Sequence, residues 1–172
     1  MTLSRAPRGE APPAAEDTSS RQAADSPPPV IVEATPLGVR AALLEMRARF
    51  GPSMPFDGSL GMAEIVLAEV LNNIVEHAYS GGRSGPIELR LVRDGIWLRV
   101  DVRDYGRPMP GESLPDADKT NADMTGAEFR PETAPEGGFG WFLIRAFARD
   151  LDYSRNGNRN RLRFTVPLNE DC

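Results

Sequence analysis

Three polar side chains that could do chemistry recur at helical spacing in the stretch AEIVLAEVLNNIVEHAYS, residues 63–80. Glu69, Asn73 and His77 are four residues apart, so in a helix they lie along one edge, while apolar residues fill the opposite face. A carboxylate can take up a proton or orient a nucleophile. An amide oxygen one turn away is a hard, neutral ligand that suits Mg²⁺. An ordinary solvated helix face explains the same residues, and this alternative stays open.

A second motif follows an expected strand. Asp104 and Gly106 come directly after residues 96–102. The carboxylate could accept a hydrogen bond from the exocyclic amine of a ring, and glycine lets the backbone approach a ligand closely. Asp and Gly are also common where a strand simply leaves a sheet, which is the alternative interpretation.

The third motif is the glycine-rich run GGFGWFLI, residues 137–144. Gly138 and Gly140 lead into an expected helix, whose free N–H groups and positive dipole end favour phosphate. A flexible hinge would have the same composition. The chain has no Walker sequence, and this run does not follow a strand as a dinucleotide-binding fingerprint does.

His77 is the one histidine of the chain. Imidazole suits phosphate acceptance and metal binding alike. Because neither a second histidine nor a cysteine lies nearby in the sequence, a transition-metal site has little support. A hydrogen-bonded structural histidine near a helix end is the other interpretation.

Hydrophobic periodicity and turn residues predict the elements that position these motifs. The dipeptide Asp94-Gly95 predicts a tight hairpin turn. The simplest layering is an α+β two-layer sandwich, with a mixed four- to five-stranded sheet and three helices on one face. The expected helices are residues 37–50, 59–79 and 141–149, and the expected strands are residues 30–32, 86–93, 96–102, 151–155 and 161–167.

The 172 residues suit one folded domain with flanking segments. Residues 1–29 contain six prolines and almost no large apolar side chain, so we expect a disordered tail. The domain is expected over residues 30–168, followed by a C-terminal tail at 169–172. Residues 107–136 lack apolar periodicity and carry seven acidic and three basic residues, a pattern typical of a long functional loop such as a lid.

Composition excludes several classes of protein. Hydrophobic residues at 40% and charged residues at 26% are typical of a soluble globular domain. No stretch reaches the roughly 18 apolar residues of a membrane helix, and the N-terminus lacks the apolar core of a signal peptide. One cysteine, Cys172, excludes a disulfide framework. The net charge of −5 argues against a direct nucleic-acid partner. The missing disulfide framework, signal peptide and membrane helix lead us to expect a cytoplasmic protein without a membrane partner.

Taken together and in this order, the three motifs resemble the N, G1 and G2 boxes of the GHKL (histidine kinase-like) ATPases. The resemblance covers about residues 30–168 and looks closest to the bacterial anti-sigma factor serine kinases of partner-switching systems. It implies the Bergerat-type ATP-binding fold. It also implies that Glu69 is the general base, that Asn73 is the Mg²⁺ ligand, that Asp104 reads the adenine amino group and that Gly106 lies beside the ring.

The same resemblance assigns the phosphate-side loop to Gly138 and Gly140 and the ATP lid to residues 107–136. It places a hydroxyl of the last strand, that of Thr165, near the adenine. The expected lid departs from the family pattern in one respect: it carries more negative than positive charge, and none of its basic residues is an obvious clamp for a γ-phosphate. The candidate phosphate contacts in it are Arg107, Lys119 and Arg130.

The implied activity is phosphoryl transfer from ATP, with Mg²⁺, to a serine of a STAS-type anti-sigma antagonist. The family also sequesters a sigma factor, usually as a homodimer. One alternative is an ATP-binding switch that holds regulatory partners without phosphoryl transfer. Another is the catalytic domain of a histidine kinase, which we consider weaker because the chain is short.

Overall fold

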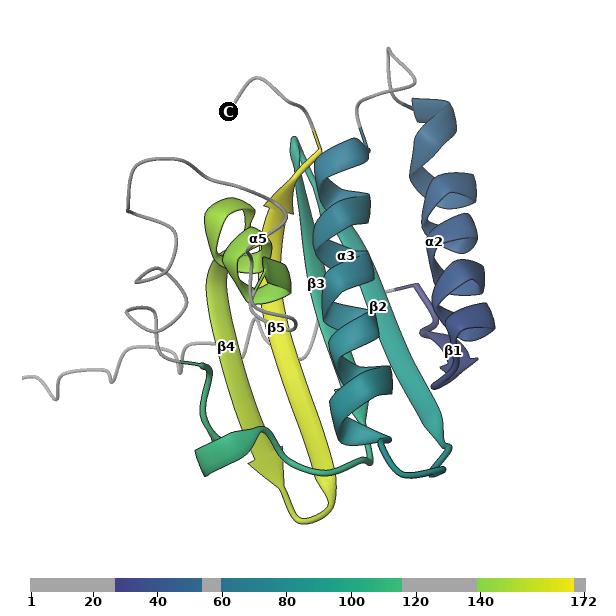
Figure 1. The fold of residues 1–172 in the computed structure, drawn as a ribbon. Coiled ribbons are helices and arrows are strands. Elements are labelled where there is room, and N and C mark those ends of the chain that lie inside the picture. Colours follow the sequence, from purple (N-terminus) through teal and green to yellow (C-terminus); the bar gives the residue numbers. More distant parts are fainter. Residues whose placement is uncertain (1–26, 54–59, 116–138, 169–172) are drawn as a thin grey trace, which may run out of the picture.

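The computed structural model describes residues 27–53, 60–115 and 139–168, which form one sheet and a layer of helices (Figure 1). Most of the expected N-terminal tail, residues 116–136 of the expected lid, and the expected C-terminal tail lie outside the described residues. The strands are β1 (Val30–Glu33), β2 (Pro86–Asp94), β3 (Trp97–Asp104), β4 (Arg149–Asn156) and β5 (Arg159–Pro167). The helices are α2 (Pro36–Phe50), α3 (Gly61–Asn73) and α5 (Phe139–Phe147), and a π-helical turn (Ile74–Ala78) extends α3.

The five strands lie in the order β1-β2-β3-β5-β4, and all four pairings are antiparallel. The two-layer α+β architecture is confirmed, but the expectation of a mixed sheet is wrong. The pairs β2–β3 and β4–β5 are joined by tight turns, which require antiparallel neighbours. Between β1 and β2 the chain passes through two helices, which return it to the end of the sheet where β1 finished.

The turn between β2 and β3 lies one residue later than the sequence suggests. Asp94 still pairs with Trp97, so the two-residue loop consists of Gly95 and Ile96. Gly95 has a φ of 61°, a conformation that glycine adopts without steric cost. The expected hairpin is therefore confirmed with a small shift.

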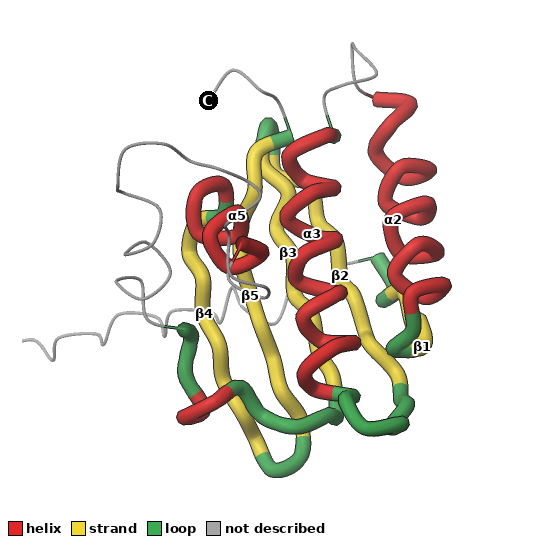
Figure 2. Tube along the Cα trace, in the orientation of Figure 1, coloured by secondary structure: helices red, strands yellow, loops and turns green. Residues whose placement is uncertain are grey.

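The core lies between the sheet and the helices, which all cover the same face (Figure 2). Because side chains alternate along a strand, one side of each central strand is apolar and buried. These side chains are Ile87, Leu89 and Leu91 on β2, Leu98, Val100 and Val102 on β3, and Leu162, Phe164 and Val166 on β5. Within the described ranges, none of the helices combines the length and the apolarity that a membrane crossing requires.

Helix α3 crosses the middle of the sheet, and its buried side includes Val66, Leu67 and Leu71. The sequence predicts one continuous helix to about residue 79. In the structure, α-helical geometry ends at Asn73, and the next turn is wider, with the N–H of Tyr79 donating to the carbonyl of Ile74 at 3.1 Å. Single π-helical turns are rare and occur often at functional sites.

Candidate functional site

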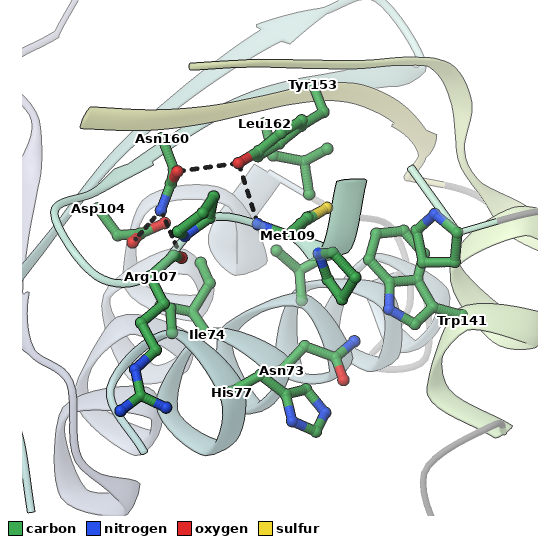
Figure 3. A pocket seen from close by; sticks show the side chains of 15 residues that line it. Asn73, Ile74, His77, Asp104, Arg107, Met109, Trp141, Tyr153, Asn160 and Leu162 are labelled. Atoms are coloured by element: carbon green, nitrogen blue, oxygen red, sulfur yellow. Dashed lines mark hydrogen bonds between the residues drawn. The ribbon is translucent and has the colours of Figure 1, made fainter. Parts of the chain in front are cut away.

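A cavity of about 430 Å³ lies between the end of α3, the first turns of α5 and the helix-facing side of β3, β4 and β5 (Figure 3). Its volume falls within the range of small-molecule sites. The walls are mainly apolar and hold a few polar groups. The lining residues are Val70, Asn73, Ile74, His77, Ala78, Asp104, Arg107, Pro108, Met109, Pro110, Pro115, Trp141, Tyr153, Asn160 and Leu162.

Asp104 is a buried carboxylate in this cavity, with 5% of its surface exposed. Its Oδ1 accepts hydrogen bonds from the side-chain amide of Asn160 and from the N–H of Gly106, both at 2.8 Å. Among the described residues, none donates to the other oxygen, Oδ2. The carboxylate is thus fixed through one oxygen and keeps the other for a ligand.

Asn160 connects Asp104 to β4 and to the start of the predicted lid. Its Oδ1 accepts from the hydroxyl of Tyr153 at 2.9 Å and from the guanidinium of Arg155. The Tyr153 hydroxyl accepts in turn from the N–H of Met109 at 3.1 Å, as Figure 3 shows. This network fixes which way the Asn160 amide faces, because its oxygen receives two donors while its nitrogen is directed to Asp104.

Burial changes the pKa values of two side chains at this end of the cavity, Asp104 and Tyr79. Desolvation raises the pKa of Asp104 above its ordinary value, although hydrogen bonds from Asn160 and Gly106 and the charge of Arg155 oppose the increase. Burial likewise raises the pKa of Tyr79. Its hydroxyl donates to the carbonyl of Pro86 and accepts from the N–H of Tyr105, both at 3.0 Å, so it fixes the chain just after Asp104.

Gly106 lies against the π-helical turn, where no side chain fits. A Cβ at this position would come within 2.6 Å of the carbonyl oxygen of Ala78. The N–H of Arg107 donates to that same oxygen at 2.9 Å. The glycine therefore lets the loop after β3 dock onto the end of the helix that carries Asn73.

Glu69, Asn73 and Gly140 come together at the other end of the site. A Cβ on Gly140, in the first turn of α5, would lie 2.6 Å from Glu69 Oε2 and 3.7 Å from Asn73 Nδ2. Asn73 lines the cavity, and its Nδ2 is buried without a hydrogen-bond partner in the described part of the chain. Burying an unpaired amide costs free energy, which is typical of a group that a ligand engages.

The remaining motif residues lie at the mouth of the cavity or outside the described residues. His77 and Arg107 are exposed and line the cavity, and the Arg107 guanidinium donates to the hydroxyl of Ser80 at 3.2 Å. Gly138, Lys119 and Arg130 lie outside the described residues. The structure therefore brings Asn73, Asp104, Gly106 and Gly140 to one site, with Glu69 adjoining it.

Thr165 does not belong to this group, and its expected position beside the adenine is wrong. Its neighbours Phe164 and Val166 are buried under the helices, so alternation directs Thr165 to the opposite face of the sheet, where it lines a different depression. The polar residue of β5 on the cavity side is Asn160. The sequence contains this signal, because Asn160 occupies the same alternating positions as Leu162 and Phe164.

A buried carboxylate with one free oxygen, in an apolar cavity that ends at an unpaired amide, defines a site for a ligand with a hydrogen-bond-donating ring and a polar tail. Residues 32–166 match the histidine kinase-like ATPase domain family, and the chain belongs to this family. The resemblance to the GHKL ATPases that the three motifs indicated is confirmed. Membership in the family implies that the chain binds ATP.

Two further comparisons agree with this family. The chain is 29% identical over 111 residues to blue-light-activated histidine kinase 2 of Erythrobacter litoralis (strain HTCC2594), covering 64% of this chain and 28% of that protein. Its fold is similar to the crystal structure of the RsbU and RsbW domains of Rv1364c from Mycobacterium tuberculosis, with a TM-score of 0.50 and 16% identity. That match covers 82% of this chain and 32% of the other. The chain thus spans about a third of each protein or less.

Proposed function

We propose that the chain is an ATP-dependent serine kinase that phosphorylates a STAS-type anti-sigma antagonist and sequesters a sigma factor. The observation that carries the proposed chemistry is the position of the Glu69 carboxylate, which lies against Gly140 and one helical turn before Asn73. The choice of protein substrate rests on the resemblance of the three motifs to the anti-sigma factor serine kinases.

The described residues fit ATP as the phosphoryl donor. The free Oδ2 of Asp104 suits the adenine amino group, and the apolar walls formed by residues such as Ile74, Met109 and Leu162 suit the ring. Arg107 lies at the mouth of the cavity and supplies a positive charge there. The nucleotide would therefore run from the buried Asp104 toward Asn73.

The side-chain oxygen of Asn73, a residue that lines the cavity, is the atom that suits a Mg²⁺ ion shared with phosphates, whereas the unpaired Nδ2 is a donor that suits a phosphate oxygen. Mg²⁺ is commonly held by one or two protein oxygens together with substrate phosphates and water. Asn73 would hold the ion through its side-chain oxygen. When bound, Mg²⁺ would neutralise charge on the phosphates and keep them in place for transfer.

Glu69 would act on the protein substrate. The serine oxygen forms a bond to the γ-phosphorus, the bond from that phosphorus to the bridging oxygen breaks, and ADP leaves with the bond's electron pair. The hydroxyl proton passes to the Glu69 carboxylate, which orients the serine beforehand. Catalysis of this kind depends mainly on positioning, and the missing side chain of Gly140 leaves the space that the Glu69 carboxylate occupies.

Transfer of labelled γ-phosphate to a purified STAS-domain protein from the same genome tests the proposal. We expect Glu69→Gln to reduce the transfer rate about 100-fold or more while the ATP dissociation constant changes less than about threefold. Glu76→Gln is the matched control, because Glu76 is an exposed carboxylate two turns further along. Equal rates for wild type and Glu69→Gln would refute the role of Glu69.

The alternative is an ATP-binding switch without phosphoryl transfer. One observation favours it: among the described cavity-lining residues, Arg107 is the sole arginine or lysine, and it is exposed. A wild-type protein that binds ATP with Mg²⁺ but labels no serine of the STAS protein would support this function. Analytical ultracentrifugation with a sigma factor of the same genome tests sequestration separately.

A further inference from the structure

A row of polar residues crosses three strands beside the cavity. Asn160 of β5 pairs with Asp104 of β3 on one side and with Arg155 of β4 on the other. We call these three residues the polar row. The next residues on the same side of β3 and β5, Val102 and Leu162, are buried and apolar. Because unpaired polar groups are costly on an apolar face, the polar row needs hydrogen bonds that pair its members with one another.

The guanidinium of Arg155 is directed into the polar row. Its Nη1 donates to Oδ1 of Asn160 at 2.5 Å and to the carbonyl of Gly106 at 3.4 Å, and 17% of the side chain is exposed. Its Nε also lies 3.9 Å from Oε1 of Glu112, but 65% of the Glu112 side chain is exposed. Ion pairs that are open to water contribute little to stability. The contact with Asn160 therefore decides where the guanidinium lies.

Asn160 connects the charge of Arg155 to Asp104. Its oxygen accepts from Arg155, and its nitrogen donates to Oδ1 of Asp104 at 2.8 Å. A charged donor on the oxygen polarises the amide, which strengthens the hydrogen bond that the nitrogen donates. Tyr153 donates to the same oxygen at 2.9 Å, but its hydroxyl is neutral. Tyr153 thus suffices to orient the amide, whereas Arg155 supplies the charge.

The same charge opposes the cost of burying Asp104. Burial raises the pKa of Asp104, whereas hydrogen bonds from Asn160 and Gly106 and the charge of Arg155 lower that pKa. A carboxylate that keeps its charge accepts hydrogen bonds through both oxygens, whereas a protonated carboxyl group donates from one of them. Arg155 therefore favours the form of Asp104 whose free Oδ2 accepts a hydrogen bond.

We propose that Arg155 is a positioning residue for recognition of the 6-amino group of adenine, and that it acts through Asn160 on Asp104. Arg155 is not among the residues that line the cavity, so it does not need to touch the nucleotide. The polar row then selects nucleotides whose base carries a hydrogen-bond donor at this position. The inference rests on the part of the proposed function that puts adenine beside Asp104, and it does not require phosphoryl transfer.

A purely structural role for Arg155 would have different consequences. Among the described strands, β4 pairs with β5 alone and forms one edge of the sheet. Charges that point inward from an edge strand discourage pairing with other chains. Loss of such a charge would change the stability or the association of the chain and would weaken the binding of every nucleotide by the same factor. Loss of a residue that positions Asp104 weakens the binding of only those nucleotides that carry the amino group.

Two nucleotides that differ only at the amino group separate these roles. ATP and purine riboside 5′-triphosphate, which has hydrogen in place of the 6-amino group, are titrated into the full chain with Mg²⁺ by calorimetry. Wild type should bind ATP about 30-fold more tightly than the analogue. Arg155→Ala should weaken ATP binding about five- to tenfold but binding of the analogue less than about twofold, which also shows that the variant folds.

Three further variants test the charge and its route. Arg155→Lys keeps the positive charge and should bind ATP within about threefold of wild type. Arg159→Ala is the matched control, because Arg159 is an exposed arginine next to Asn160 in the chain, and it should change neither affinity. In an Asn160→Ala background, Arg155→Ala should weaken ATP binding by less than about a further twofold, because the amide that connects Arg155 to Asp104 is gone.

The proposal is overturned if Arg155→Ala loses affinity for both nucleotides by the same factor, or if it loses none for ATP. A full additional loss in the Asn160→Ala background would overturn the route through the amide. Equal affinity of wild type for the two nucleotides would overturn the proposal together with the position of adenine beside Asp104. A chain that shows the expected affinities but transfers no phosphate would refute the proposed kinase activity alone.

Discussion

The side-chain amide of Asn160 donates to Oδ1 of Asp104 at 2.8 Å, although the two residues are 56 positions apart in the chain. They are direct partners in the β3–β5 register and are both buried, with 3% and 5% of their surfaces exposed. The bond occupies one carboxylate oxygen and leaves the other facing the cavity. Asn160 therefore determines which oxygen of Asp104 a ligand in the cavity can reach.

The first prediction concerns this bond. Asn160→Ala should weaken ATP binding about tenfold and lower the free energy of unfolding by about 1–3 kcal/mol, because it leaves a buried carboxylate short of a donor. Isothermal titration calorimetry and urea unfolding measure the two effects.

Thr165→Ala is the control for Asn160→Ala, since it changes the same strand on the opposite face. It should leave ATP affinity unchanged. If Thr165→Ala lost ATP affinity and Asn160→Ala kept it, the side of β5 that carries Asn160 would not be the side that binds ATP.

Most of the fold could be predicted from the sequence because its signals are local. Strict alternation along β2, β3 and β5 reflects a sheet that is apolar on one face only. The α5 boundary was less predictable: the helix was expected to reach residue 149, but it ends at Phe147, and Arg149 already pairs with Thr165 in the sheet. Strand pairing over long sequence distances overrides local helix preference at such a boundary.

Less of the candidate site could be predicted. Asp104, Gly106, Asn73 and Gly140 belong to recognisable motifs, and the structure brings them together. Tyr153 and the π-helical turn after Asn73 were missed, since both depend on tertiary contacts. The Tyr153 hydroxyl joins Asn160, across the β4–β5 hairpin, to Met109, which is 44 positions earlier in the chain. No periodicity in a single segment reports such a network.

The second prediction compares two aspartates on β3 whose pKa values shift in opposite directions. Burial raises the pKa of Asp104 above 3.8, so its ionisation costs stability as pH rises from 3.8 through the folded-state pKa. Asp104→Asn should therefore equal or exceed wild type in unfolding free energy at pH 7, and the difference should vanish below about pH 3.8. The same variant should lose ATP affinity about 100-fold, because an NH₂ group, which donates, takes the place of an oxygen that would accept from the adenine amino group.

The pKa of Asp101 shifts in the opposite direction to that of Asp104. Burial alone would raise its pKa, but hydrogen bonds from Arg161 and Arg103 lower the pKa below its usual 3.8. Its contribution to stability is thus complete above pH 3.8 and is lost as pH falls through the folded-state pKa. Asp101→Asn should cost about 1–2 kcal/mol at pH 7 and leave ATP affinity unchanged. Urea unfolding between pH 3 and 8 measures both effects. If the unfolding free energies of Asp104→Asn and Asp101→Asn depended on pH in the same way, the opposite pKa shifts of the two aspartates would be contradicted.

The third prediction concerns the unpaired amide of Asn73. Asn73→Ala should be at least as stable as wild type, because it removes a buried group without a described partner and improves helix propensity by about 0.5 kcal/mol. ATP affinity in the presence of Mg²⁺ should fall about 30-fold or more, whereas affinity in EDTA should match wild type. Asn72→Ala, at the exposed neighbouring position of the same helix, gains the same helix propensity but should change ATP affinity neither with Mg²⁺ nor in EDTA. Equal Mg²⁺ dependence in all three proteins would exclude Asn73 as the ligand.

The fourth prediction concerns the close approach of α5 to Glu69. Gly140→Ala would put a Cβ 2.6 Å from Glu69 Oε2, so the carboxylate must move. Because a displacement of about 1 Å can reduce catalysis about 100-fold, we expect phosphoryl transfer to fall by that order while ATP binding weakens less than tenfold. Gly51→Ala is the matched control: its Cβ would meet only Leu60 Cδ1 at 3.9 Å, and its φ of −54° suits alanine. The control should keep full activity and gain about 0.4–1 kcal/mol of stability. Undiminished transfer by Gly140→Ala would show that the Glu69 carboxylate need not occupy its present position during the reaction.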